Sequence, residues 1–193
     1  MFDDGPQPAY VFKICLLGQV AVGKTCIARR LCYDTFDANT KLTIGIDFYT
    51  YELPIILDGE ETFVRLSIWD LGGQVQFRKL FHYYIRGADG VFMVFDLSNL
   101  QTLLNLDWWY EKLSGYDEVG APRIIIGAKN DLAEKDEEKS RINDLIINQF
   151  LKTHEENEYY KTSSKTGFNI DKIFVELSRS ILDKYKMMYE LVV

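Results

Sequence analysis

Apolar runs alternate along the chain with segments whose apolar residues recur at helical spacing. Three of the runs, Tyr10–Leu17, Gly90–Asp96 and Arg123–Gly127, are apolar at nearly every position, which is typical of strands buried on both faces. The amphipathic segments predict helices over Cys26–Tyr33, Leu100–Leu113, Ile142–His154 and Asn169–Tyr189. This alternation predicts one α/β domain, in which a mostly parallel sheet carries helices on both faces.

A hairpin is predicted at one edge of the sheet. Phe48–Leu57 and Phe63–Trp69 are strand-like, and they are joined by the hairpin turn signal Asp58-Gly59, followed by two extra residues, Glu60-Glu61. Pro54 suits an edge strand, because proline cannot donate a hydrogen bond to a strand ladder. The sequence therefore predicts an antiparallel pair beside the parallel strands.

The remaining segments fit a single domain over residues 1–193. Glu158–Thr162 predicts a short final strand, and the charge-rich stretch Leu132–Arg141 predicts a solvated loop. A chain of 193 residues can bury one substantial core, and we find no linker-like segment that divides it. The two ends, 1–9 and 190–193, are expected to be flexible.

Composition and charge exclude several classes of partner. With 47% hydrophobic and 26% charged residues the chain is an ordinary globular protein, and its net charge of −7 argues against nucleic acid or an anionic membrane as the main partner. Its three cysteines, an odd number without metal-ligand spacing, predict reduced cytosolic thiols. The sequence contains no signal peptide, no apolar run of about 20 residues and no C-terminal cysteine for prenylation. We therefore expect a soluble, cytoplasmic monomer that reaches membranes only through partners.

The most specific motif is Gly18-Gln19-Val20-Ala21-Val22-Gly23-Lys24-Thr25, which matches the phosphate-binding pattern G-x-x-x-x-G-K-[ST]. It follows a predicted strand and leads into a predicted helix. Glycine lets backbone N–H groups turn toward phosphate oxygens, and the helix N-terminus adds partial positive charge. Lys24 adds a full charge, and Thr25 offers a hydroxyl to Mg²⁺. The competing interpretation, a glycine-bounded turn with an ordinary surface lysine, is disfavoured by the strand and helix around the motif.

A second motif, Asp70-Leu71-Gly72-Gly73-Gln74, ends the second strand of the hairpin. Asp70 can hold the water shell of Mg²⁺, the N–H of Gly73 can bond a terminal phosphate, and Gln74 can orient an attacking water. The competing interpretations are a helix N-cap for Asp70 and a surface polar residue for Gln74.

Two further segments follow later strands. In Lys129-Asn130-Asp131 the carboxylate can accept both the N1–H and the 2-amino group of guanine, which adenine does not offer. In Thr162-Ser163-Ser164-Lys165 the backbone N–H groups of Ser163 and Ser164 can contact guanine O6. Each segment alone also fits an ordinary loop. Together, at successive strand ends where parallel sheets bind their ligands, the motifs predict a guanine-nucleotide site.

With these motifs the chain resembles the Ras-like small GTPases, and within them the Rab branch, from about Phe12 to the last helix. Thr43-Ile44-Gly45-Ile46-Asp47-Phe48 is similar to the first switch of Rab proteins, and Trp69 to Gln74 is similar to the second. Arg86-Gly87-Ala88-Asp89-Gly90 resembles the segment before the fourth Rab strand. The resemblance implies a P-loop NTPase fold with a six-stranded sheet and five helices. It also implies GTP and GDP as ligands with Mg²⁺, and protein effectors and regulators that bind segments 37–48 and 71–84.

Roles for single residues come from the same resemblance. Thr25, Thr43 and Asp70 would hold Mg²⁺, Phe36 would flank the guanine, and Lys24 and Gln74 would be catalytic. The nucleotide-binding residues that it implies are Gly18, Val20, Ala21, Val22, Gly23, Lys24, Thr25, Cys26, Phe36, Thr43, Gly73, Lys129, Asp131, Ser163, Ser164 and Lys165.

The chain departs from the family at four places. Ala128 stands where the family usually has asparagine, so one base contact and one loop-tying hydrogen bond are missing and weaker binding is expected. Leu71-Gly72 replaces the usual threonine-alanine pair, and Val75 replaces a glutamate that commonly follows the glutamine. Val20 replaces the glycine of Ras, and its bulk should crowd both Gln74 and an incoming arginine finger.

Two functions remain open from the sequence. The first is a guanine-nucleotide-dependent switch that hydrolyses GTP slowly, by in-line attack of water on the γ-phosphate. The second is an interaction module that binds nucleotide with negligible turnover; Val20 and Ala128 favour it, and the intact phosphate and magnesium motifs oppose it. A small-molecule phosphotransferase is disfavoured, because no acceptor-binding lid is evident.

Overall fold

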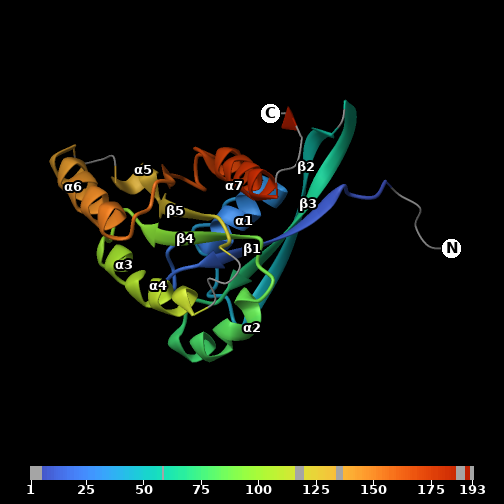
Figure 1. The fold of residues 1–193 in the computed structure, drawn as a ribbon. Coiled ribbons are helices and arrows are strands. Elements are labelled where there is room, and N and C mark those ends of the chain that lie inside the picture. The colour runs from blue at the N-terminus through green and yellow to red at the C-terminus, as the bar shows by residue number, and fades with distance from the viewer. Residues whose placement is uncertain (1–5, 58, 116–119, 134–136, 186–189, 192–193) are drawn as a thin grey trace.

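A computed structural model describes residues 6–57, 59–115, 120–133, 137–185 and 190–191. Within these residues one seven-stranded sheet has the order β6-β5-β4-β1-β3-β2-β7 (Figure 1). The strands are β1 Tyr10–Leu17, β2 Ile46–Leu57, β3 Glu60–Leu71, β4 Gly90–Asp96, β5 Arg123–Ala128, β6 Tyr159–Lys161 and β7 Glu190–Leu191. Strands β6, β5, β4, β1 and β3 are parallel, and β2 is antiparallel to β3 and to β7. The predicted α/β class, with a mostly parallel sheet and one antiparallel hairpin, is confirmed.

Helices cover both faces of the sheet (Figure 1). Their bounds are α1 Lys24–Tyr33, the 3₁₀ helix η1 Val75–Leu80, α2 Phe81–Ile85, α3 Gln101–Leu104, α4 Asp107–Ser114, α5 Asn130–Ala133, α6 Glu137–Thr153 and α7 Ile170–Lys184. Residues of α1 and α7 belong to one apolar cluster, and residues of α2, α3, α4 and α6 belong to a second. The sheet therefore separates two cores, each closed by its own set of helices.

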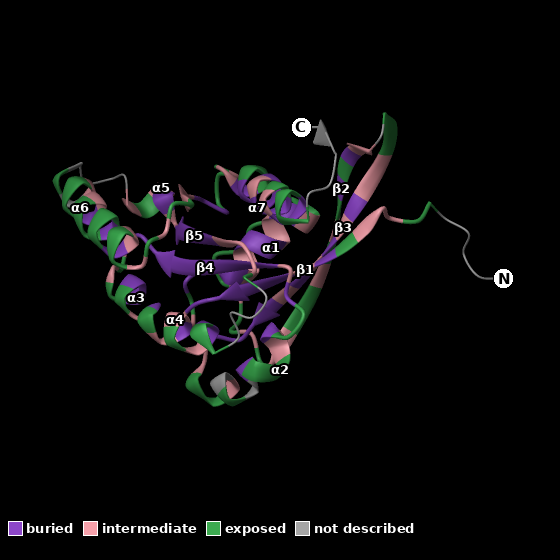
Figure 2. Cartoon of the chain, in the orientation of Figure 1, coloured by how far each residue is buried: buried purple, intermediate pink, exposed green. Residues whose placement is uncertain are grey.

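The central strands are buried because apolar side chains fill both of their faces. Every residue of β4 is buried, which accounts for its uninterrupted apolar run (Figure 2). On one face Phe92 meets Phe174 of α7 edge to face, with ring centroids 4.9 Å apart. On the other face Phe81 of α2 and Trp109 of α4 pack in the same way, with centroids 5.5 Å apart.

The single helix predicted over Leu100–Leu113 is wrong, because the structure divides it into α3 and α4. The buried residues Leu103, Leu106 and Trp109 are linked by hydrogen bonds that span three residues, as in a 3₁₀ turn, where those of an α-helix span four. Matching bonds run from the N–H of Leu106 to the carbonyl of Leu103, and from the N–H of Trp109 to the carbonyl of Leu106. The tighter winding keeps all three side chains in the core.

Two other helix bounds differ from the sequence prediction. Helix α6 begins at Glu137 within the predicted loop, and an acidic first turn stabilises a helix N-terminus. Residues 134–136 of that predicted loop lie outside the described residues. Helix α7 ends at Lys184, and residues 186–189, which were predicted to extend it, also lie outside the described part.

The hairpin and the number of strands also differ from expectation. Glu60 pairs with Leu57, so Glu60 and Glu61 belong to β3 and are not extra loop residues. Gly59 has φ +83°, which suits a tight two-residue turn, whereas residue 58 is not described. Within the segment 190–193, Glu190–Leu191 pairs with Ile55 and Ile56 and adds a seventh strand to the predicted six, because the edge of β2 offers backbone groups for pairing. Residues 1–5 and 192–193 lie outside the described residues.

Replacing Phe174 by alanine should lower the free energy of unfolding by about 3–5 kcal/mol, because the side chain is 1% exposed and its loss leaves a cavity against Phe92. Urea unfolding followed by circular dichroism measures the change. The matched control is Phe168→Ala, which removes a 48%-exposed ring and should cost less than about 1 kcal/mol. Equal losses in both variants would contradict the assignment of α7 to the core.

Candidate functional site

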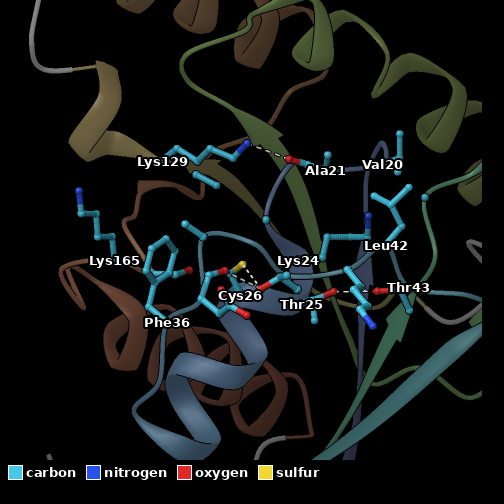
Figure 3. A pocket seen from close by; sticks show the side chains of 18 of the residues that line it. Val20, Ala21, Lys24, Thr25, Cys26, Phe36, Leu42, Thr43, Lys129 and Lys165 are labelled. Carbon is cyan, nitrogen blue, oxygen red and sulfur yellow. Dashed lines mark hydrogen bonds between the residues drawn. The ribbon is translucent and has the colours of Figure 1, made fainter.

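A pocket of about 440 Å³ lies where the parallel strands end. Its walls come from the loop after β1, from Gly73 after β3, from the end of β5 and from the loop after β6. The volume is that of a small-molecule site, and the position is the one at which parallel sheets bind ligands. Figure 3 shows Phe36, Lys129 and Lys165 toward one end of the pocket and Lys24, Thr25 and Thr43 toward the other.

The loop between β1 and α1 has a backbone path that depends on its glycines. Gly18 has φ +141°, and a Cβ placed there would lie 2.2 Å from the carbonyl oxygen of Val94. Gly23 has φ +112° and is the N-cap of α1. Val22 is 1% exposed, and its side chain packs into the core and so fixes the loop to the domain. The sequence pattern is therefore matched by a tight loop that opens a helix.

Lys24 is the first residue of α1, directly after this loop, and is only 6% exposed. Its Nζ donates hydrogen bonds to the carbonyl oxygens of Gly18 and Gln19, both at 2.9 Å. Burial lowers the pKa of Lys24 to about 8, and the nearby Asp70 carboxylate opposes that shift. A buried ammonium group that faces a pocket favours an anionic ligand there.

Two threonine hydroxyls and one carboxylate meet beside Lys24. The Oγ1 atoms of Thr25 and Thr43 are 2.8 Å apart, and both hydroxyls lie within hydrogen-bond distance of Asp70 Oδ2. Asp70 is fully buried, and its Oδ1 has no hydrogen-bond partner. Burial raises the pKa of Asp70, and the Thr25 hydroxyl and the Lys24 charge oppose that rise.

This group of oxygens fits Mg²⁺. Adjacent ligands of an octahedral Mg²⁺ at 2.0–2.1 Å stand about 2.9 Å apart, which is close to the separation of the two hydroxyls. The orphaned oxygen of Asp70 is a further acceptor for the water shell that Mg²⁺ keeps. Within the described residues no cluster of three or more His, Cys, Asp or Glu side chains could hold a metal, so hydroxyls supply most of this candidate site.

The segments predicted as switches touch each other and the phosphate loop through backbone. The N–H of Gly72 donates to the carbonyl of Gly45 at 2.9 Å. A Cβ on Gly73 would lie 2.4 Å from the backbone nitrogen of Val20, so only glycine fits against the loop. Gln74 does not line the pocket, and its Oε1 accepts a hydrogen bond from Gln76 Nε2 at 2.9 Å.

At the opposite end the pocket is formed by residues of the two predicted base motifs. Lys129, Asp131, Ser164 and Lys165 line it, together with Phe36. The hydroxyl of Ser163 donates to Asp131 Oδ1 at 2.6 Å, which orients the carboxylate.

The N–H of Ser163, which was predicted to contact the base, has a partner within the protein. This N–H donates to the carbonyl of Phe168 at 3.1 Å and is not directed at a base. The turn that leads into α7 needs that bond, because a buried backbone N–H must have a partner. The contact of Ser163 with the base motif is made by its hydroxyl, and the base contacts predicted for the N–H groups of Ser163 and Ser164 stay predictions.

Arg30 of α1 was not found from the sequence. Its Nε donates to the carbonyl of Ser164 at 2.6 Å, and its Nη2 donates to the carbonyl of Lys165 at 2.7 Å. Its Nη1 pairs with Asp34 at 2.7 Å. One side chain therefore ties the helix behind the phosphate loop to the loop at the opposite end of the pocket.

Most of the predicted nucleotide-binding residues line the pocket. Gly18, Val22 and Ser163 do not, and neither do Asp70 and Gln74. The lining residues that were not assigned to nucleotide binding from the sequence are Asp37, Ala38, Thr40, Lys41, Leu42 and Leu132, whereas Ala128 was already placed at the base motif. Their closeness in sequence to predicted site residues could have indicated them. Residues 37–42 lie within the first predicted switch, and Leu132 directly follows Asp131.

Comparison with known proteins agrees with this geometry. The sequence profile of the Ras family matches residues 13–183. Ras-related protein Rab-8 of Diplobatis ommata is 35% identical over 176 residues, which cover 91% of this chain and 79% of that protein. Human Ras-related protein Rab-8B is 34% identical over 91% of this chain and 80% of its own length. GTP-binding protein ypt1 of Schizosaccharomyces pombe is 30% identical over 93% of this chain and 84% of its own length.

The fold and the phosphate loop thus define a P-loop GTPase domain, and the chain belongs to the Ras family. Within that family it is a Rab-like GTP-binding protein. Ras and Rab proteins generally bind GTP or GDP with Mg²⁺, and they bind regulators and effectors. No helix in the described part of the chain is long and apolar enough to cross a lipid bilayer.

Replacing Arg30 by methionine should speed the release of a fluorescent GDP analogue about tenfold, because the carbonyls of Ser164 and Lys165 lose charge-assisted hydrogen bonds. Stopped-flow fluorescence in the presence of Mg²⁺ measures the rate. Arg65→Met is the control, since Arg65 pairs with Glu52 on the hairpin away from the pocket. The role assigned to Arg30 fails if both variants release the analogue at the wild-type rate.

Proposed function

We propose that the protein is a switch that binds GTP and GDP with Mg²⁺ and hydrolyses GTP slowly without a partner. The observation that carries the proposal is the meeting of Thr25, Thr43 and Asp70, with hydroxyl oxygens 2.8 Å apart and one buried carboxylate oxygen unpartnered. Thr43 belongs to the first predicted switch, and Thr25 belongs to the phosphate loop. A ligand that holds these two residues together orders the first switch segment. When the ligand is lost, that segment is free to move.

The phosphate end supports roles for individual residues. Lys24 would neutralise phosphate oxygens, and the N–H groups of the loop would bind them at the start of α1. Bound Mg²⁺ would neutralise further phosphate charge, held by Thr25 and Thr43 with Asp70 behind them. Asp131, oriented by Ser163, would accept the hydrogen bonds of guanine.

Slow hydrolysis is supported by the surroundings of Gln74. Val20, with its branched side chain, lines the pocket, and the backbone at Gln19 and Val20 lies so close to Gly73 that no Cβ fits between them. Gln74 would have to leave Gln76 and enter that crowded space before it could orient a water. Without Gln74 the in-line attack lacks its positioning group, so a partner protein is needed for a full rate.

The alternative is a nucleotide-binding interaction module with negligible turnover. The bond between Gln74 and Gln76 and the missing side chain at Ala128 favour it. Both alternatives use the same candidate docking surface on segments 37–48 and 71–84. There Ile44, Phe48, Val75 and Tyr83 expose large apolar side chains, which is typical of a protein-binding face.

The setting of this switch is also part of the proposal. We infer that the protein is a cytoplasmic monomer that reaches membranes only through partners. The net charge of −7 supports this, because an acidic protein is repelled by anionic lipid surfaces. Residues 1–193 are proposed to form one G domain, as the continuous sheet and its two cores support.

Single-turnover GTP cleavage separates the switch from the interaction module. Purified wild-type protein should cleave bound GTP slowly, Gln74→Leu should abolish cleavage, and Val20→Gly should speed it about tenfold by opening space for the glutamine. Gln76→Leu is the matched control, because it removes an exposed amide and frees Gln74, so cleavage should persist. Undetectable cleavage by the wild type would favour the interaction module.

Chelation tests the magnesium site. Excess EDTA should speed GDP release from the wild type at least tenfold, because phosphate charge is then left without its cation. Asp70→Asn should release GDP quickly even with Mg²⁺ and respond little to EDTA. Glu52→Gln is the control, since Glu52 is an exposed carboxylate that pairs with Arg65 on the hairpin away from the pocket. An EDTA response of wild-type size in Asp70→Asn would exclude Asp70 from the site.

A further inference from the structure

Asp96, the last residue of β4, contacts the base motif from behind the pocket. Its carboxylate is 10% exposed, and Oδ2 accepts a hydrogen bond from Lys129 Nζ at 2.7 Å. The same Nζ donates to the carbonyl oxygen of Ala21 at 2.8 Å (Figure 3). A chain of contacts therefore runs from β4 through Lys129 to the phosphate loop.

Lys129 and Ala21, which its side chain contacts, both have a backbone conformation that needs support. Ala21 has φ +63° and Lys129 has φ +62°, a left-handed conformation that residues with a Cβ rarely adopt. Such turns persist where surrounding contacts fix them. The bond from Nζ to the Ala21 carbonyl joins the two turns, and the nearly buried charge of Asp96 holds the ammonium group in place.

Ala128, the residue before Lys129, cannot help to link the base motif to the phosphate loop. Ala128 is 3% exposed, and its methyl group lies on the side of Gly23, 3.8 Å from where a Cβ of that glycine would stand. A methyl group makes no hydrogen bond, so the side chain at 128 provides no polar link between the base motif and the phosphate loop. Lys129 provides that link, and Asp96 orients it.

We propose that Asp96 is a positioning residue for nucleotide binding: it fixes Lys129 on the Ala21 carbonyl and replaces the polar link that Ala128 lacks. The inference rests on the proposed binding of guanine nucleotide. Asp96 itself touches neither the base nor the phosphates. It acts through Lys129, which lines the pocket.

The two oxygens of Asp96 have separate partners, which allows their roles to be tested apart. Oδ2 accepts from Lys129, whereas Oδ1 accepts from the N–H of Ser98 at 2.8 Å and from its hydroxyl at 2.6 Å. Asp96→Asn keeps one acceptor for the turn at Ser98 and removes the charge that holds Lys129. Ser98→Ala removes a bond of the turn and leaves the Lys129 pair intact, so it is the matched control.

The test is a double-mutant cycle between positions 96 and 128, with the release rate of a fluorescent GDP analogue as the readout. In the natural background Asp96→Asn should speed release about tenfold, and Ser98→Ala should change it less than about twofold. Ala128→Asn restores a polar side chain between the two loops, so Asp96→Asn in that background should speed release less than about threefold. A merely structural Asp96 would show the same factor in both backgrounds.

Three outcomes overturn the inference: an unchanged rate in Asp96→Asn, equal factors in the two backgrounds, or an effect of Ser98→Ala as large as that of Asp96→Asn. Thermal unfolding of each variant comes first, and Asp96→Glu, which displaces the charge, takes the place of Asp96→Asn if the latter does not fold. Denaturing freshly purified wild type and identifying the released nucleotide tests the proposed function separately. Wild type that neither releases nor rebinds a guanine nucleotide overturns both proposals, whereas binding with a flat cycle overturns only the role of Asp96.

Discussion

The buried ammonium group of Lys24 is the interaction on which the site depends. Removing this charge from water is costly unless it is bonded, and the carbonyl oxygens of Gly18 and Gln19 provide the bonds. The loop passes so close to β4 at this point that only glycine fits, because a Cβ on Gly18 would clash with the carbonyl oxygen of Val94. A loop whose carbonyls bond the lysine inside leaves N–H groups for an anion outside. The sheet, the glycine and the lysine thus produce one anion site together.

Helix α1 connects the end of the pocket that would bind phosphate to the end that would bind the base. Lys24 and Thr25 form its first turn, and Arg30, less than two turns later, holds the carbonyls of Ser164 and Lys165. A rigid helix therefore sets the distance between the parts of the pocket that would contact phosphate and base. Lys129 makes a second connection through the Ala21 carbonyl, so the two ends cannot separate without breaking a charged contact.

The sequence predicted the sheet well because buried parallel strands are apolar throughout. The bounds of β1 and β4 agree with the runs Tyr10–Leu17 and Gly90–Asp96. It failed for 100–113, where apolar residues at helical spacing predicted one helix, because hydrogen bonds of the 3₁₀ type at Leu106 and Trp109 divide that segment in two. Motif residues were found because each role needs one residue type at one spacing. Arg30 was not found, because its partners Ser164 and Lys165 lie 134 and 135 positions away in the sequence. A contact between positions so far apart produces no local sequence pattern.

The glycine pair after Asp70 explains how a single ligand contact can control two segments. Gly72 bonds the carbonyl of Gly45 in the first switch, and Gly73 lies against the backbone of Val20. Thr43, two residues before Gly45, lies at the candidate metal site through its hydroxyl. If that hydroxyl loses its ligand, the Gly45 carbonyl can move, and Gly72 then loses its partner too. Both contacts are made by backbone, and one such hydrogen bond contributes only about 0.5–1.5 kcal/mol, so the proposed switch needs little free energy to break the bond from Gly72.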